Sequence, residues 1–252
     1  MLENPDLLRG NMPHAELIVA VGSKAGEVAV QQSVTPVLIV MTPQSGYETL
    51  LASFVAPQKP PNFSAIYINQ PWDRQLDFLF AVLPLQHKVG VLYSPAMQKD
   101  VAILRDGVSA RGGTLIAEAV ESEATLFADL ERVLQSSEVL LALPDSRIYS
   151  SNNVRNILLS TYRTNVPLIG FSQAYVNAGA IAAIFSTPEQ LAEQAASAVQ
   201  MLMQTGHLPA AQYPNSFSIA INQQVARSLG IELGSEQDIR ARMRKRVRSS
   251  YD

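Results

Sequence analysis

Short apolar runs alternate with segments of helical periodicity between residues 139 and 193. The apolar runs cover residues 139–143, 166–171 and 180–185, and the segment 153–162 carries apolar side chains at helical spacing. Fully apolar runs of this length are typical of strands that are buried on both faces, as in parallel sheets covered by helices. This stretch therefore predicts parallel β-strands connected by α-helices, which is an α/β fold.

The same alternation extends over most of the chain. Further short apolar runs predict strands, with helices between them, at residues 17–21, 37–41, 65–68, 89–93, 114–120 and 217–221. A chain of 252 residues, 47% of them hydrophobic, is long enough for one large domain or two small ones and can fill a core.

Polar residues follow several of these strands, and ligands of parallel sheets bind just beyond the carboxyl ends of the strands. The candidate ligand-binding residues are Gly22, Ser23, Thr42, Tyr47, Tyr93, Ser94, Asp145, Ser172 and Gln173. Each has a structural alternative. Ser23 is also suited to cap a helix, Ser94 precedes Pro95 in a turn, and Tyr47 can stack on a ligand or pack in the core.

Asp145 is the strongest single candidate. A carboxylate at a strand end can pair with an amino group of a ligand. The alternative is that Asp145 caps the turn that leads to Asn153. Trp72 follows the strand predicted at residues 65–68, where it would serve as a contact at a chain crossing or as a ligand platform.

Composition excludes several classes of function. A formal net charge of -3 predicts no general affinity for nucleic acid, and the absence of cysteine excludes disulfides and thiolate metal sites. His14, His87 and His207 show no metal-ligand spacing, and the sequence contains no nucleophile elbow, Walker A loop or dinucleotide fingerprint. We therefore expect no cofactor, no metal and no enzymatic activity.

The sequence shows no apolar run long enough to cross a membrane, and residues 1–10 lack the apolar core of a signal peptide. Two explanations are open: the chain stays in the cytoplasm, or its numbering starts after a removed segment.

Five stretches together resemble one family. They read LIVAVGSKA, QPWDRQLDFLFAVLPLQHKVGVLYSP, VLLALPDSRIYS, VPLIGFSQAYVNAGAIAAIFSTPEQLAEQAA and FSIAINQQVARSLGI. Their order and spacing, from about residue 15 to residue 232, resemble the uncharacterised ABC-transporter substrate-binding proteins, a group that includes tryptophan- and tyrosine-binding transport lipoproteins.

The resemblance implies a periplasmic-binding-protein fold of type I, with two Rossmann-like α/β lobes joined by three crossovers and a small ligand, such as an amino acid, clamped between them. Lobe one would comprise residues 1–69 and 185–214, and lobe two residues 70–184 and 215–252. It also implies a non-catalytic solute receptor in the periplasm that delivers its ligand to an ABC permease.

The sequence departs from the family pattern at its beginning. Family members carry a strand, a helix and a second strand before the stretch that matches Leu17 to Ser23, whereas about 16 residues precede it here. The resemblance therefore implies a truncated first lobe, and the chain is a fragment, a reduced form or a sequence whose start has been misassigned. If residues 1–252 are the whole chain, Leu17–Val21 forms an open sheet edge with unpaired backbone groups. We then expect a homodimer through this edge, or a swap of the first segment with a partner.

Other functions are kept as alternatives. The chain could be a ligand-sensing module that regulates a partner protein, or a reduced family member that no longer binds solute. A doubly wound enzyme would need a catalytic set that the sequence lacks. The basic tail, which begins with a capping box at Ser235 and Asp238, fits a solvated helix better than a lipid-binding segment, because it shows no evident apolar face.

Overall fold

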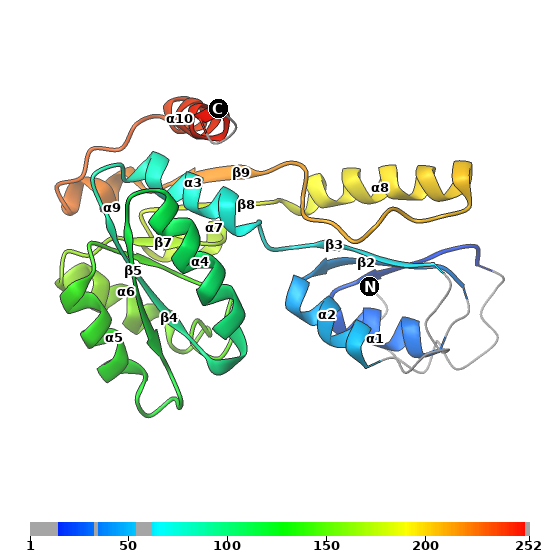
Figure 1. Cartoon of the computed structure of the whole chain (residues 1–252), viewed down its shortest axis with the longest axis horizontal. Coiled ribbons are helices and arrows are strands. Elements are labelled where there is room, and N and C mark those ends of the chain that lie inside the picture. The colour runs from blue at the N-terminus through cyan, green and yellow to red at the C-terminus, as the bar shows by residue number, and fades with distance from the viewer. Residues whose placement is uncertain (1–14, 33–34, 54–61, 250–252) are drawn as a thin grey trace. The chain divides into compact units, whose positions relative to one another are not determined.

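The computed structural model describes residues 15–32, 35–53 and 62–249. The chain divides into two compact units, which Figure 1 colours by residue number. Unit 1 comprises Met1–Gln70 and Ser186–Ser218, and unit 2 comprises Pro71–Phe185 and Ile219–Asp252. The chain thus passes from one unit to the other three times.

Unit 1 contains a parallel three-stranded sheet in the order β1-β2-β3. Its elements are β1 (Ile18–Val21), α1 (Ser23–Gln32), β2 (Val37–Thr42), α2 (Gln44–Ala52), β3 (Phe63–Tyr67) and α8 (Pro188–Thr205). Helices α1 and α2 pack on one face of the sheet and α8 packs on the other (Figure 1). Strand β2 is therefore covered on both sides, which explains why its sequence is apolar at almost every position.

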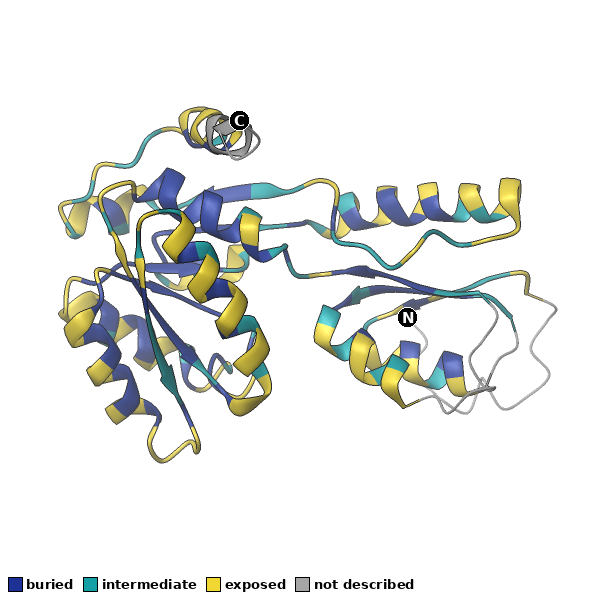
Figure 2. Ribbon diagram, viewed as in Figure 1, coloured by how far each residue is buried: buried dark blue, intermediate teal, exposed yellow. Residues whose placement is uncertain are grey.

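Helix α8 has a well-defined start and a single buried side. Thr187 and Gln190 form a reciprocal capping box, and Pro188 occupies the first turn. Leu191, Ala195 and Ala198 are buried against the sheet. Figure 2 shows dark blue, buried segments alternating with exposed ones along α8, as expected for an amphipathic surface helix.

Unit 2 contains a six-stranded sheet in the order β5-β4-β6-β7-β8-β9, in which neighbours from β5 to β8 pair in parallel. Its strands are β4 (Lys88–Tyr93), β5 (Thr114–Ala119), β6 (Val139–Leu141), β7 (Leu168–Gly170), β8 (Ala182–Phe185) and β9 (Ser218–Ile221). Its α-helices are α3 (Trp72–Val82), α4 (Gln98–Ala110), α5 (Leu126–Ser136), α6 (Val154–Arg163), α7 (Gln173–Ala178), α9 (Gln223–Ser228) and α10 (Glu236–Ser249).

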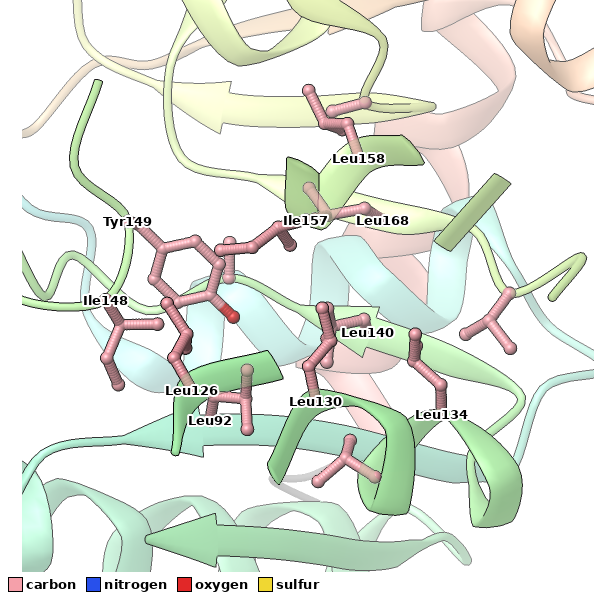
Figure 3. Close-up of a cluster of buried hydrophobic side chains, with 14 of the residues drawn as sticks. Leu92, Leu126, Leu130, Leu134, Leu140, Ile148, Tyr149, Ile157, Leu158 and Leu168 are labelled. Carbon is pink, nitrogen blue, oxygen red and sulfur yellow. The ribbon is translucent and has the colours of Figure 1, made fainter. Parts of the chain in front are cut away.

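The core of unit 2 lies on both faces of this sheet. Figure 3 shows one cluster, in which leucines of α5 and α6 pack against strand residues such as Leu92, Leu140 and Leu168. Helix α3 is buried along almost its whole length and contacts α4, α10 and β8. The α/β fold with parallel sheets predicted from the apolar runs is confirmed.

The segments of unit 1 that adjoin the chain crossings are hydrogen-bonded to one another. Gln70 Nε2 donates to Ser186 Oγ at 2.8 Å, and Ser186 Oγ donates to the Ser216 carbonyl at 2.6 Å. Gln70 and Ser186 are both buried. In the structure the chain changes units at 70/71, 185/186 and 218/219. The family resemblance implies changes at 69/70, 184/185 and 214/215.

The basic tail forms α10, which packs on α3. The predicted capping box is confirmed, because Ser235 Oγ accepts from the Asp238 amide and Asp238 Oδ2 accepts from the Ser235 amide. These bonds from Ser235, the side-chain bond first, hold the pKa of Asp238 below its ordinary value. The prediction that this segment has no apolar face was wrong, since Ile239 and Met243, four residues apart, are buried.

Arg242 adds a polar contact to this packing. Its Nη1 donates at 3.0 Å to the carbonyl of Ala81, in the last turn of α3, where helix carbonyls lack partners within the helix. The described part of α10 therefore supports the fold. Of the helices in the described ranges, none has the length and apolar character needed to cross a bilayer.

We predict that Ile239→Ala lowers the free energy of unfolding of unit 2 by about 2–4 kcal/mol, because it leaves a cavity under α10. Arg244→Ala, at an exposed position of the same helix, should change it by less than about 0.5 kcal/mol. Urea denaturation followed by circular dichroism measures both. Equal effects of the two changes would show that α10 does not stabilise unit 2.

A second prediction concerns Tyr149, whose buried Oη has no hydrogen-bond partner among the described residues. Burial, with smaller contributions from Tyr175 and Asp145, raises the pKa of this phenol. Tyr149→Phe should therefore leave the free energy of unfolding unchanged or raise it by about 1 kcal/mol.

Tyr175→Phe is the matched control, because Tyr175 Oη donates to the Tyr149 carbonyl at 2.8 Å. Loss of this hydrogen bond in Tyr175→Phe should lower the free energy of unfolding by about 1 kcal/mol. Thermal and urea denaturation distinguish the two tyrosines, and a larger loss in Tyr149→Phe would contradict the prediction.

Candidate functional site

The carboxyl edge of the unit 1 sheet brings together two of the predicted residues. Gly22 directly follows β1 and has a φ of 86°, a left-handed conformation that glycine adopts readily, and α1 begins at the next residue. Ser23 Oγ then lies 2.8 Å from Thr42 Oγ1 at the end of β2. Ser23 is exposed, whereas Thr42 is buried.

A bulge in β2 orients Thr42. The register with β3 shifts between Val40 and Thr42, and Met41 between them has a φ of 59°. A left-handed, non-glycine residue inside a strand is strained, and it changes the alternation of the side chains that follow. Consistent with this, Met41 packs on the same α8-facing cluster as Val40. The bulge is a local feature that the apolar pattern of this segment did not predict.

Gly46 allows α2 to approach the two hydroxyls. A Cβ atom at this position would lie 3.2 Å from Ser23 Oγ and 3.3 Å from Thr42 Oγ1, closer than most side-chain contacts. The absence of a side chain therefore leaves room beside the Ser23–Thr42 pair.

Sequence reasoning missed the amides at this edge. Asn69 lies two residues after β3, and its Oδ1 accepts a hydrogen bond from the Gln44 backbone amide at 2.9 Å. This bond gives a partner to a first-turn amide of α2, which has none within the helix. The Gln44 side chain bonds the Tyr213 hydroxyl and Glu48. Asn69 and Gln44 follow strands just as the selected serine and threonine do, so their position was an available signal.

Tyr47 lies in the core of unit 1, the alternative that the sequence left open. Its ring stacks on Phe63 at a centroid distance of 5.0 Å and lies 5.8 Å from Tyr67, and only 8% of Tyr47 is exposed. Burial, with a smaller contribution from Tyr67, raises the pKa of Tyr47 to about 12. This tyrosine therefore stays protonated and packs as an aromatic core residue.

The carboxyl edge of the unit 2 sheet is organised by Asp145. Its Oδ2 accepts from the Ser94 amide at 3.0 Å and its Oδ1 accepts from the Arg147 amide at 3.0 Å. The carboxylate thus joins the end of β4 to the turn after β6. The bond to Arg147, two residues on, is an Asx-type turn, so the capping role considered for Asp145 is present. The second lone pair of each oxygen remains available as an acceptor.

The remaining predicted residues lie near the ends of β4 and β7. Tyr93, the last residue of β4, is half-buried, and Ser94 is buried. Ser172 occupies the N-cap position of α7 without a capping bond from its side chain, and the exposed Gln173 donates to Asn177 Oδ1 at 2.9 Å. The predicted set therefore includes two directly hydrogen-bonded pairs, Ser23 with Thr42 in unit 1 and Ser94 with Asp145 in unit 2.

Two features of the unit 2 edge were not selected from the sequence. Phe171 and Tyr175 are half-buried aromatic residues whose ring centroids lie 4.5 Å apart. Arg147 is exposed on the turn that Asp145 stabilises. An aromatic residue directly after a strand and a cation two residues after a predicted site were both visible signals. Trp72, by contrast, is buried and donates to Asp100 Oδ1 at 2.7 Å, which gives it a structural role.

Chemically, these edges offer hydroxyls, amides, one carboxylate and aromatic rings. Such groups can bind a small polar ligand through hydrogen bonds and stacking. Among the described residues, no group of three or more acidic or histidine side chains is placed to hold a metal ion; His14 lies outside the described ranges.

Comparisons with solved structures identify the fold. A conserved domain protein from Vibrio cholerae has a TM-score of 0.68 and 19% identity, and the match covers 95% of this chain and 82% of that one. An ABC domain from Streptococcus pneumoniae in complex with L-Trp has a TM-score of 0.67 and 18% identity, with 94% and 82% covered. The ligand-free, open structure of CD0873, a substrate-binding protein with adhesive properties from Clostridium difficile, has a TM-score of 0.69 and 17% identity, with 88% and 76% covered.

A search of curated protein sequences finds no match. The sequence model of the family described as "ABC transporter substrate binding protein" matches residues 9–243, which is most of the chain. This protein therefore belongs to the ABC transporter substrate-binding protein family.

Proposed function

We propose that this protein is the solute-binding component of an ABC-type importer and that it binds a small ligand, an amino acid or a similar molecule, without chemical conversion. The observation that carries the proposal is the family match over residues 9–243. The polar carboxyl edges of the two sheets support it, because this is where parallel sheets hold ligands.

Eight of the nine residues selected from the sequence are the ligand contacts that we propose, whereas the ninth, Tyr47, packs in the core. Ser23 and Thr42 present adjacent hydroxyls at the unit 1 edge, and the backbone after Gly22 offers amides at the start of α1. In unit 2, Tyr93, Ser94, Asp145, Ser172 and Gln173 follow strand ends, and Tyr47 contributes by supporting the unit 1 edge from the core.

L-Tryptophan is the first ligand to test, since a protein of the same fold is described in complex with it. The half-buried aromatic residues Phe171 and Tyr175 support an aromatic ligand, because offset or edge-on rings stabilise each other. Members of the family typically work in the periplasm or outside the cell, and we propose the same for this chain, with an ABC permease as its partner.

We predict that a saturating amino acid raises the melting temperature of the protein. A ligand that binds only the folded state, at a concentration of about 100 times its Kd, stabilises that state by about 2.7 kcal/mol. The measurement is a thermal-shift series with L-tryptophan, L-tyrosine, other amino acids, sugars and purines. No shift with any amino acid would count against the proposed ligand class.

The Ser23–Thr42 pair provides the matching variants. Thr42→Val and Ser23→Ala each remove one hydroxyl, so each should weaken binding of the identified ligand by about 0.5–1.5 kcal/mol. Ser109→Ala, an exposed change at the other end of the sheet in unit 2, should leave the Kd unchanged. If calorimetry gives the same Kd for all three variants, the unit 1 edge is excluded as a binding surface.

A further prediction concerns Asp145. In Asp145→Asn an amide nitrogen replaces one acceptor oxygen, so the Ser94 or the Arg147 amide loses its partner and the free energy of unfolding falls by about 1–3 kcal/mol. If the free lone pairs also receive the ligand's ammonium group, the affinity for L-tryptophan falls by about 1.5–3 kcal/mol.

A ligand without the ammonium group separates these two roles. Calorimetry with L-tryptophan and with indole-3-propionate, which lacks that group, should show that Asp145→Asn weakens only the first. A loss that is the same for both ligands would assign Asp145 to positioning of the turn and would remove the ammonium contact from the proposal.

A further inference from the structure

The side chain of Tyr175 connects two parts of the unit 2 edge that are far apart in the sequence. From α7, its Oη donates a hydrogen bond to the backbone carbonyl of Tyr149 at 2.8 Å. The amide of Tyr149 donates in turn to the backbone carbonyl of Asp145 at 2.8 Å. The phenol of Tyr175 therefore reaches the turn that carries Asp145 through one intervening residue.

The Asp145 turn is closed by its own hydrogen bonds. In addition to the bond from Tyr149, the Arg147 amide donates to Oδ1 of Asp145 and the Ser94 amide donates to Oδ2, both at 3.0 Å. These bonds determine the shape of the turn and attach it to the end of β4. None of them involves α7, so they do not by themselves fix the distance between the carboxylate and α7.

The place of Tyr175 is specified by Gly170, the last residue of β7. A Cβ atom at position 170 would lie 2.7 Å from the Cβ of Tyr175, closer than real Cβ atoms come to a heavy atom. The glycine thus lets α7 approach the strand. Phe171 follows it, with its ring centroid 4.5 Å from that of Tyr175. Tyr175 therefore has two contacts: its hydroxyl holds Tyr149, and its ring pairs with Phe171.

Tyr149 anchors the other end of this connection in the core. It is only 6% exposed and packs in the cluster of buried side chains that Figure 3 shows. Its ring centroid lies 6.4 Å from those of Phe171 and Tyr175, in edge-on geometry. Because packing already orders both the donor and the acceptor, the hydrogen bond between Tyr175 and Tyr149 needs little further loss of conformational entropy.

We propose that Tyr175 is a positioning residue for ligand binding, which holds the Asp145 carboxylate at a constant separation from the Phe171–Tyr175 aromatic pair. This inference rests on the proposed function, in which the carboxylate receives the ammonium group of an amino acid and the rings receive an aromatic side chain. Contacts that are held in place before binding lose less entropy when the ligand arrives. Unit 2 thereby favours ligands that carry both groups over ligands that carry only one.

Tyr175→Phe, which keeps the ring and removes the hydroxyl, tests the inference without any ligand. In nuclear magnetic resonance spectra of the full chain, the amide protons of Ser94 and Arg147 report their bonds to Asp145, because a shorter hydrogen bond moves the proton signal downfield. We expect both signals to move upfield in Tyr175→Phe. They should stay in place in Tyr162→Phe, the same change at an exposed tyrosine of α6.

Unchanged Ser94 and Arg147 signals in Tyr175→Phe would overturn the inference. In that case the local bonds of the turn and the packing of the Tyr149 ring would hold the carboxylate without help from the phenol.

Calorimetry tests the ligand part of the inference. Tyr175→Phe should raise the Kd of L-tryptophan about three- to tenfold, whereas Tyr162→Phe should not change it. The Kd of indole-3-propionate, which lacks the ammonium group, should be the same in Tyr175→Phe as in the unchanged protein. In an Asp145→Asn background, Tyr175→Phe should cause no further loss of L-tryptophan affinity, because both changes act on one contact.

Equal losses for the two ligands, or additive losses in the double variant, would overturn the positioning role. A different result marks failure of the proposed function: if no amino acid binds to the unchanged protein, the ligand part of this inference falls with it. The magnetic resonance spectra then still decide whether Tyr175 holds the Asp145 turn.

Discussion

The structure depends on the burial of parallel strands on both of their faces. A strand in this position has no solvent-facing side, so polar residues are excluded from its length and collect where it ends. Strand β2 shows the constraint most clearly, with α1 and α2 on one side and α8 on the other. The location of the candidate ligand-binding groups thus follows from the same packing rule that determines the fold.

That rule explains how much could be predicted from the sequence. Apolar runs and helical spacing identified the parallel α/β architecture, and the capping motif at Ser235 and Asp238 was readable because it involves neighbouring residues. Contacts between segments that are distant in the sequence could not be predicted from such local patterns. Ile239 and Met243 are two apolar positions in a strongly charged segment, and their role becomes visible only when α3 lies beside them.

The candidate site shows the same division. The strand ends predicted which residues lie at the carboxyl edges, but not how each one is used. Tyr47 packs in the core because Phe63 and Tyr67 from β3 contact its ring. Met41 adopts a left-handed backbone conformation at the β-bulge where the register between β2 and β3 shifts. Asp145 combines its predicted position with a local turn, since one carboxylate oxygen holds Arg147 and the other reaches a separate loop at Ser94.

The hydroxyl of Ser186 receives a hydrogen bond from Gln70 and donates one to the carbonyl of Ser216. Three segments that are far apart in the chain therefore share a single oxygen atom. A residue change at position 70 or 186 alters what the other position must supply, so the side chains there are free to vary only in compatible combinations. Position 216 is different, because it contributes a backbone carbonyl that any residue supplies, so the side-chain requirement falls on positions 70 and 186 alone.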